Sequence, residues 1–287
     1  MSSNYKIFPI NDIVKNYEAL IIDIWGVIYD GYAPFNNAIN FLNKMIDDDK
    51  AIIFLSNTPR PGTLSDKIFS SWGVNMQKAS VYTSGDAVRE QLIFWNDDVF
   101  KNLGRKFYHL GEERNHDLLA NLEVGVVTNL NQANFILMSL YMDEGEDLNY
   151  YDGFLKEAIA LKLPVICANP DLTANHGKEI RYCAGSFAKK YEEWGGTVYY
   201  YGKPDSRIFN SVLAKYKNMG ISDKKRILMI GDTLETDILG ANRVGIDSAM
   251  VLTGNGQRIE SKIKATEHDI FKDFQAKPTW ISYGMKE

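Results

Sequence analysis

Residues that could carry out chemistry follow several short apolar runs in this 287-residue chain. Asp23 and Ser56-Asn57-Thr58 follow two runs near the N-terminus, and Lys203, Asp232 and Asp237 follow two runs nearer the C-terminus. Two or three carboxylates with few histidines favour a hard cation, and Mg²⁺ is usually held by one or two carboxylates together with water and phosphate oxygens. The set therefore indicates metal-assisted chemistry on a phosphoryl group.

The individual side chains suit that chemistry. Lys203 would neutralise a phosphoryl oxygen, while Ser56 and the N–H groups of the loop after it would donate hydrogen bonds to another. Asp23 would be the nucleophile, because neutralisation of charge by a metal and a lysine eases attack on phosphorus. Any one of these residues is also common in turns and helix caps. Their presence after four separate runs favours the catalytic interpretation.

The apolar runs that precede these residues alternate with segments of helical period. Strands are expected at 19–22, 51–55, 197–201, 226–230 and 248–252, and helices at 38–46, 64–72, 208–216 and 234–244. This alternation predicts an α/β fold with a parallel sheet and right-handed crossovers. The carboxyl ends of neighbouring strands in such a sheet meet at one crevice, where ligands bind. We therefore expect residues far apart in the sequence to converge there.

The middle of the chain repeats the strand-and-helix pattern separately. Strands are expected at 106–108, 124–127, 135–138 and 164–167, and helices at 150–160 and 186–194. Because the strands before and after this region are expected to share one sheet, we interpret 95–184 as a domain inserted into a core made of 1–94 and 185–287.

Composition and charge exclude several classes of protein. Hydrophobic residues make up 45% of the chain, which is ample for a buried core, and the net charge of −5 disfavours a nucleic-acid partner. Cys167 and Cys183 do not form a C-x-x-C pair, so neither a disulfide scaffold nor a zinc site is supported. No signal peptide is apparent, and no apolar run approaches the ~20 residues of a membrane span. We expect a cytoplasmic protein without a membrane partner.

Four segments, taken in order, resemble the four motifs of the haloacid dehalogenase-like hydrolases. They are Asp23-Ile24-Trp25-Gly26-Val27, Leu55-Ser56-Asn57-Thr58, Gly202-Lys203-Pro204, and Gly231-Asp232-Thr233 with Asp237. The long insert, Asn169-Pro170-Asp171 and Pro278-Thr279-Trp280-Ile281 resemble the class IIA branch, the NagD-type sugar and nucleotide phosphatases. This resemblance implies a Rossmann-like core with an inserted α/β cap domain of the C2 type. It also implies a Mg²⁺-dependent phosphatase for a small phosphorylated metabolite such as a sugar phosphate.

The resemblance further implies which residues hold the metal. Asp23 would form an aspartyl-phosphate intermediate and also ligate Mg²⁺. The backbone carbonyl of Trp25 and the carboxylate of Asp232 would be the other protein ligands, and Asp237 would support them.

Other roles implied by the resemblance concern the phosphoryl group and the substrate. Ser56 would bind the phosphoryl group with help from Asn57 and Thr58, and Lys203 would stabilise Asp23 and the group in transfer. The segment from Asn169 to Asp171 is the candidate specificity loop of the cap, and an ordinary turn after a strand is the alternative.

The sequence departs from the family pattern at Trp25. The family normally has an aspartate there, which protonates the leaving group and later activates water, and tryptophan cannot transfer a proton in that way. Loss of a general acid or base typically costs about 10²–10⁴ in rate. Asp30 is near enough in the sequence to be proposed as a substitute, although a turn residue before Gly31 is the plainer interpretation. Trp25 either fills space beside the leaving group, or turns away and packs in the core while an acid from elsewhere does the work.

Two other functions remain open on the sequence. The first is a phosphometabolite-binding protein that kept the fold and metal site but lost efficient turnover, which Trp25 favours and the intact Asp23 and Lys203 oppose. The second is a dehalogenase or phosphonate hydrolase. Asp232 opposes the dehalogenase, and no amine nucleophile for a phosphonatase is identified in the insert. The sequence does not determine the oligomeric state, and a homo-oligomer is one of the alternatives.

Overall fold

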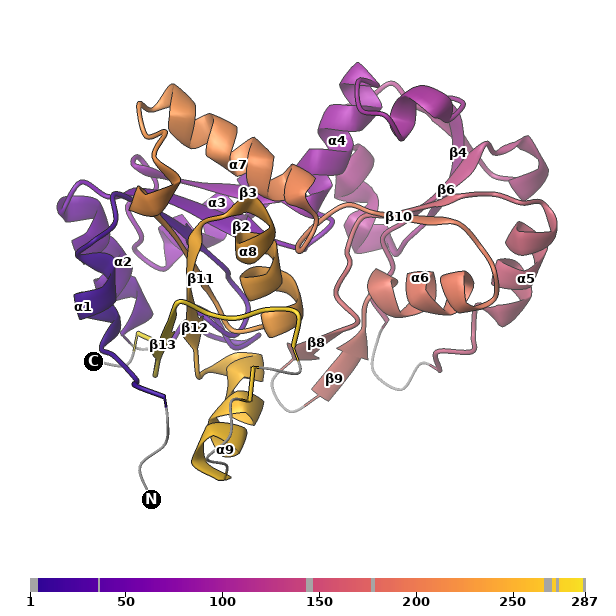
Figure 1. Ribbon diagram of the computed structural model, residues 1–287. Coiled ribbons are helices and arrows are strands. Elements are labelled where there is room, and N and C mark those ends of the chain that lie inside the picture. The colour runs from indigo at the N-terminus through magenta and orange to yellow at the C-terminus, as the bar shows by residue number, and fades with distance from the viewer. Residues whose placement is uncertain are drawn as a thin grey trace. The chain divides into compact units, whose positions relative to one another are not determined.

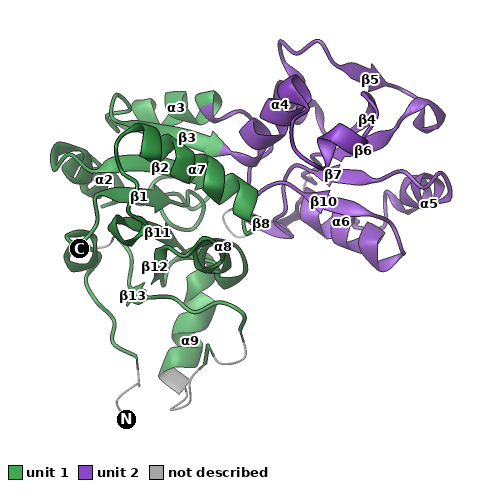
Figure 2. Cartoon of the chain, turned by 45° about the horizontal axis from the view of Figure 1, so that its top comes forward, with its two compact units in different colours: residues 1–56, 63–82, 203–287 green, residues 57–62, 83–202 purple. Residues whose placement is uncertain are grey.

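The computed structural model describes residues 5–35, 37–142, 147–176, 179–265, 270–271 and 274–285. The chain divides into two compact units, of which unit 1 comprises Met1–Ser56, Thr63–Tyr82 and Lys203–Glu287, and unit 2 comprises Asn57–Gly62 and Thr83–Gly202 (Figure 2). Each unit contains a sheet of parallel strands with helices packed on it (Figure 1). The predicted α/β class with parallel sheets is confirmed.

The sheet of unit 1 has six strands. Their spatial order is β13 (Trp280–Ser282), β12 (Asp247–Val251), β11 (Ile227–Gly231), β1 (Ala19–Ile22), β2 (Ala51–Ser56) and β3 (Ala79–Thr83). The central strands are apolar runs because helices cover both of their faces. Ile22 pairs with Ile230 of β11 and with Phe54 of β2, so these three strands end next to one another.

Amphipathic helices cover the sheet of unit 1. In α2 (Ala38–Asp47) the buried residues Phe41, Leu42, Met45 and Ile46 recur at helical spacing, which gives the helix one apolar face. That face joins the buried cluster on one side of the sheet, together with residues of α1 (Ile10–Val14) and α3 (Gly62–Ser71). Further helices in the described part of unit 1 include a π-helix (Leu234–Ile238), α7 (Ser206–Asn218), α8 (Leu239–Val244) and α9 (Gln257–Ala265).

Tyr216 of α7 connects the two strands that end at the candidate site. Its buried hydroxyl donates a hydrogen bond of 2.6 Å to the carbonyl of Leu20 in β1 and accepts one of 3.0 Å from the N–H of Ile53 in β2. Tyr216→Phe would leave both backbone groups without this partner, so we expect the free energy of unfolding to fall by about 1–3 kcal/mol. Urea denaturation measures the change. Tyr150→Phe, on a side chain that is 73% exposed, is the control, and equal losses in the two variants would contradict the assignment.

The sheet of unit 2 has five parallel strands and separate helices. The spatial order of the strands is β10 (Val198–Tyr200), β7 (Val165–Cys167), β6 (Phe135–Met138), β4 (Lys106–Leu110) and β5 (Gly125–Val127). α4 (Ser84–Phe94) shares one buried cluster with β4 and β6, and α5 (Asp152–Ala160) and α6 (Ala184–Glu193) share another with β6 and β7. A two-stranded hairpin, β8 (Thr173–His176) and β9 (Glu179–Tyr182), completes the unit.

The strand expected at 197–201 was predicted to belong to the sheet that carries Asp23, and this prediction is wrong. This strand, β10, pairs with β7 of unit 2 rather than with the sheet of unit 1. The physical reason is packing, because Tyr199 and Tyr201 lie in the cluster of Phe100, and Val198 lies in that of α5 and α6. An apolar run predicts a strand but carries no information about the strand it pairs with.

The limits of unit 2 lie outside the predicted insert at both ends. The insert was expected at 95–184, and unit 2 extends from Thr83 to Gly202 with the short segment Asn57–Gly62 in addition. The added length is α4 at one end and α6 with β10 at the other, and all three contribute to the buried clusters of unit 2. The interpretation of unit 1 as a catalytic core and unit 2 as a cap remains a prediction.

The helices in the described part of the chain are short. The longest of them, α7, has 13 residues, whereas a membrane span needs about 20. Within the described ranges, no helix has the length and apolar character to cross a membrane.

Candidate active site

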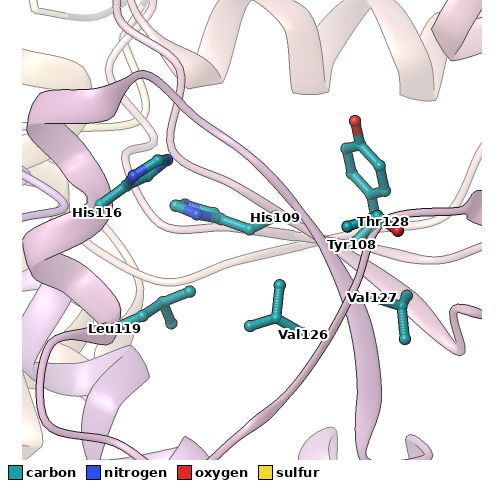
Figure 3. A pocket seen from close by; sticks show the side chains of 7 residues that line it. All are labelled: Tyr108, His109, His116, Leu119, Val126, Val127 and Thr128. Atoms are coloured by element: carbon teal, nitrogen blue, oxygen red, sulfur yellow. The ribbon is translucent and has the colours of Figure 1, made fainter.

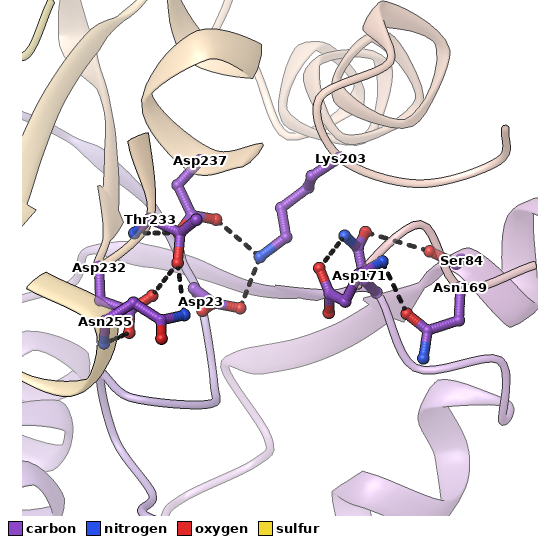
Figure 4. A network of polar contacts seen from close by, with 10 residues as sticks. Asp23, Ser84, Asn169, Asp171, Lys203, Asp232, Thr233, Asp237 and Asn255 are labelled. Atoms are coloured by element: carbon purple, nitrogen blue, oxygen red, sulfur yellow. Dashed lines mark hydrogen bonds and ion pairs between the residues drawn. The ribbon is translucent and has the colours of Figure 1, made fainter. Parts of the chain in front are cut away.

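Asp23, Lys203 and Asp237 form a connected group in unit 1 (Figure 4). The Lys203 ammonium donates to Asp23 Oδ1 at 2.5 Å and to Asp237 Oδ1 at 2.7 Å. Lys203 is only 3% exposed and Asp237 is fully buried, so these are ion pairs shielded from solvent. A fourth group, Asp232, lies beside them, and carboxylate oxygens of all three aspartates are within 4.8 Å of one another.

The local chain explains how these side chains meet. Asp23 follows β1 and Asp232 follows β11, and the two strands are paired up to Ile22 and Ile230. Asp237 lies in the π-helix after β11, and its Oδ2 accepts a hydrogen bond from the Thr233 N–H at 3.1 Å. The three aspartates therefore come from two neighbouring strand ends, as the parallel-sheet argument predicted.

The carboxylate of Asp232 is held by donors on both oxygens. Oδ1 accepts from the Thr233 hydroxyl at 2.8 Å and Oδ2 accepts from the Asn255 N–H at 2.7 Å. Gly26 and Gly254 make room for it, since a Cβ at either position would lie 2.0 or 2.1 Å from Asp232 Oδ2. Each carboxylate oxygen has a second lone pair, so these hydrogen bonds leave Asp232 able to bind a cation.

The electrostatics of this group suit a divalent cation. Three buried carboxylates face one ammonium, which leaves two negative charges to be compensated if all are ionised. Burial, followed by the charge of Asp237, raises the pKa of Asp232 to about 7. Burial also raises the pKa of Asp23 well above its usual value, and Lys203 opposes that shift. All the candidate ligand atoms are hard carboxylate oxygens, which fit Mg²⁺ better than a softer metal.

Asn57, Asn169 and Asp171 form a second polar group, which lies within unit 2. Figure 4 shows Asn169, Asp171 and Ser84 of this group. The Asn57 amide donates to Asp171 Oδ1 at 2.8 Å, and the Ser84 hydroxyl donates to Asn57 Oδ1 at 3.2 Å. The Asp171 N–H donates to Asn169 Oδ1 at 3.1 Å. These side chains were expected to bind substrate, and the structure places them in hydrogen bonds with one another.

Ser56 and Thr58 flank Asn57 in the chain. Ser56 is the last residue of β2 and is buried, so it lies at the strand end next to that of β1. The Thr58 carbonyl accepts a hydrogen bond from the Gly85 N–H at 3.1 Å, which holds the loop against the start of α4. The phosphoryl-binding roles expected of Ser56 and Thr58 remain predictions.

Trp25 packs against other aromatic side chains. Its ring lies edge-on to that of Tyr29 with centroids 5.1 Å apart, and Tyr29 stacks on Trp72 at 5.1 Å. The half-buried indole also contacts the core cluster of unit 1. The indole is thus only partly buried, and its place beside a leaving group remains a prediction.

Asp30 behaves as a turn residue. Its exposed carboxylate accepts hydrogen bonds from the N–H groups of Tyr32 at 2.8 Å and Ala33 at 2.9 Å. The hydrogen bond from Ala33, followed by that from Tyr32, lowers the pKa of Asp30. A carboxyl group held in its ionised form is a poor donor of protons, so Asp30 is unsuited to replace the missing acid.

Two residues that donate hydrogen bonds to these two polar groups, Asn255 and Ser84, were not predicted from the sequence. Asn255 donates to Asp232 through its N–H and to the Thr233 hydroxyl through its amide, the latter at 3.0 Å. It follows β12, the neighbour of β11 in the sheet. Ser84 lies at the start of α4, after the strand β3, which was not predicted.

A separate cavity of about 340 Å³ lies in unit 2 beside His109 and His116 (Figure 3). His109 Nε2 is 2.8 Å from the Ser139 hydroxyl. Burial, together with the charge of His116, lowers the pKa of His109 to about 4, so its ring is neutral at pH 7. The walls otherwise come from Tyr108, Leu119, Val126, Val127 and Thr128. Among the described residues, no carboxylate lines this cavity, which distinguishes it chemically from the group around Asp23.

Family models match both ends of the chain. A model described as haloacid dehalogenase-like hydrolase matches residues 20–125, and a HAD-hydrolase-like model matches residues 200–277. The first range contains the segments of Asp23 and Ser56, and the second contains those of Lys203 and Asp232.

Relatives match over nearly the whole length. A solved haloacid dehalogenase-like hydrolase from Brucella suis 1330 is 30% identical, covers 96% of this chain and 98% of its own, and has a TM-score of 0.80. Ribonucleotide monophosphatase NagD of Escherichia coli (strain K12) is 25% identical over 282 residues, which are 96% of this chain and 98% of NagD. Dihydroxyacetone phosphatase of Corynebacterium glutamicum (strain R) is 26% identical over 243 residues, 82% of this chain and 80% of that protein.

Proposed function

This chain belongs to the haloacid dehalogenase-like hydrolase family, and we propose that it is a Mg²⁺-dependent phosphatase of small phosphorylated metabolites. The observation that carries the proposal is the buried group of three carboxylates and one lysine at the ends of β1 and β11. Two of the relatives named above carry the name of a phosphatase, and they match over 96% and 82% of this chain. Their names, a ribonucleotide monophosphatase and a dihydroxyacetone phosphatase, support a small phosphate ester as the substrate.

Asp23 is the proposed nucleophile. Its carboxylate attacks phosphorus, the bond from phosphorus to the leaving oxygen breaks, and an aspartyl-phosphate forms that water then hydrolyses. Lys203 contacts Asp23 at 2.5 Å, so its positive charge orients the carboxylate and compensates the charge of the incoming phosphoryl group. Ser56 is the proposed hydrogen-bond donor to a phosphoryl oxygen.

Asp23 and Asp232 are the proposed metal ligands, with the carbonyl of Trp25, and Asp237 supports them through Lys203. When bound, Mg²⁺ would withdraw negative charge from the phosphoryl oxygens. Thr233 and Asn255 orient Asp232 for this role through the hydrogen bonds described above.

A binding protein without efficient turnover is the second candidate, and Trp25 is the observation that favours it. Release of phosphate from p-nitrophenyl phosphate separates the two functions, because this leaving group needs little protonation. The phosphatase should release phosphate with Mg²⁺ and none when the metal is chelated. A protein that binds p-nitrophenyl phosphate with Mg²⁺ and releases no phosphate would support the binding function instead.

Trp25→Asp tests the consequence of the missing acid. We expect turnover of alkyl phosphates to rise about ten-fold or more, given the ~10²–10⁴ usually attached to general acid–base catalysis. Turnover of aryl phosphates should change less, because their leaving groups depart without protonation. Steady-state kinetics on a series of esters with increasing leaving-group pKa measures the difference.

Trp25→Asn is the matched control, since it removes the indole and its contact with Tyr29 without adding an acid. An equal gain in both variants would assign the effect to space rather than to proton transfer. A folded Trp25→Asp variant that requires Mg²⁺ and shows no gain on alkyl esters would refute the missing-acid account.

A further inference from the structure

We propose that Asp171 is a positioning residue for Ser56 and Lys203, an inference that rests on the proposed function of those two residues. Asp171 acts through Asn57, Ser84 and Gly202, and these four residues are called the clamp below. All four belong to unit 2, and none of them needs to touch substrate.

The place of the clamp in the chain is the first argument. The chain passes between the compact units at four peptide bonds, and two of these join Ser56 to Asn57 and Gly202 to Lys203. Each of these two crossings therefore has a proposed site residue on one side and a clamp residue on the other.

The contacts within the clamp are the second argument. The buried Asn57 side chain uses both ends of its amide, since Nδ2 donates to Asp171 at 2.8 Å and Oδ1 accepts from Ser84 at 3.2 Å. A buried amide held at both ends has one orientation. The same contacts restrain the backbone of Asn57, which the peptide bond joins to Ser56.

Gly202 places the crossing from Gly202 to Lys203 next to Asn57 and Ser84. Its φ of +146° lies in the region that favours glycine, and a Cβ there would lie 2.4 Å from Ser84 Oγ and 2.6 Å from Asn57 Oδ1. The backbone just before Lys203 thus packs directly on the side chains that hold Asn57. One clamp therefore fixes both crossings that adjoin the site.

A different carboxylate holds the other two crossings. Asp86 accepts hydrogen bonds from the N–H groups of Gly62 at 3.1 Å and Thr83 at 3.0 Å. Neither Gly62 nor Thr83 adjoins a proposed site residue. Asp171 and Asp86 thus hold different pairs of crossings, and only the pair held by the clamp of Asp171 adjoins Ser56 and Lys203.

Double-mutant kinetics on p-nitrophenyl phosphate with Mg²⁺ test the proposal. Because a displacement of about 1 Å can cost on the order of 10²-fold in rate, we expect Asp171→Ala to lower kcat by about 10- to 100-fold with little change in KM. Asn57→Ala should have the same effect, and the double variant should be no worse than either single one. Asp171→Asn should recover most of the loss, since its amide oxygen can accept the same hydrogen bond.

The opposite pattern would overturn the proposal. A raised KM with unchanged kcat in Asp171→Ala, together with losses that multiply in the double variant, would show that Asp171 binds substrate independently of Asn57. Failure of Asp171→Asn to recover activity would also count against a role as hydrogen-bond acceptor.

Hydrogen exchange provides a readout that does not depend on activity. The amides of the non-proline residues in 57–62 and 201–205 should exchange faster in Asp171→Ala and in Gly202→Ala, whereas those of β1 should not change. Gly195→Ala is the matched control, because Gly195 also has a positive φ of +92° but has no atom near its Cβ position. Unchanged exchange at both segments would refute the clamp, even if the wild-type protein had no phosphatase activity.

Discussion

Asp23→Asn is expected to lower kcat for phosphate release by about 10⁴-fold or more, the scale on which loss of an enzymatic nucleophile is felt. Asparagine keeps the size and shape of the side chain but is too weak a nucleophile to attack phosphorus. The site should otherwise survive, because Lys203 keeps its ion pair with Asp237 at 2.7 Å. Phosphate release under saturating substrate and Mg²⁺ measures the loss.

Asp30→Asn is the matched control for this variant. It makes the same chemical change seven residues later, on an exposed carboxylate whose two acceptor bonds an amide oxygen can keep. We expect its kcat to stay near that of the wild type. Similar losses in Asp23→Asn and Asp30→Asn would place the nucleophile elsewhere, and an active Asp23→Asn would do so by itself.

Asp232→Ala is expected to abolish Mg²⁺-dependent activity while the fold remains intact. The variant removes one of the two proposed carboxylate ligands and leaves Asn255 and Thr233 as donors without their acceptor. Binding of a ligand to the folded state alone stabilises a protein by about 2.7 kcal/mol at a hundred times its Kd. Mg²⁺ should therefore raise the Tm of the wild type and leave that of Asp232→Ala unchanged.

Asp98→Asn is the control for the metal experiment, since the Asp98 side chain is fully exposed and remote in sequence from the site. Its Tm should respond to Mg²⁺ as the wild type does. A Tm of Asp232→Ala that rises with Mg²⁺ by as much as that of the wild type would show that the cation binds elsewhere.

The strands that carry Asp23, Ser56 and Asp232 could be predicted from the sequence because they are buried on both faces. Such strands are continuous apolar runs, and β1, β2 and β11 begin and end within one residue of the expected limits. The strand β3 was not predicted, because its sequence from Ala79 to Thr83 mixes apolar and polar residues. Three of its five residues are only partly buried.

Pairing between distant segments could not be predicted, and this explains the error at β10. Lys203 was expected to follow a strand of the sheet that carries Asp23, but it follows a strand of the other sheet and still contacts Asp23. The residue type and its place after a strand were enough to select Lys203. The residue type and the preceding strand could not show to which sheet that strand belongs.

Side-chain contacts were the least predictable feature. Asn57 and Asp171 are separated by 114 positions, and nothing in either segment indicates that the two side chains meet. The role expected of Asp171 came from the resemblance of Asn169-Pro170-Asp171 to the class IIA branch. Its hydrogen bond to Asn57 is a property of the folded unit and leads to a different proposal.

Covalent capture of the phosphoryl group on Asp23 is the most direct test of the proposed chemistry. With Trp25 in place of the aspartate that would activate water, hydrolysis of the aspartyl-phosphate should be slower than its formation from p-nitrophenyl phosphate. Rapid acid quench followed by mass spectrometry should find the phosphoryl group on the peptide that contains Asp23, in step with an initial burst of p-nitrophenol. Turnover by the wild type with the phosphoryl group on another residue, or with the same burst in Asp23→Asn, would contradict the account.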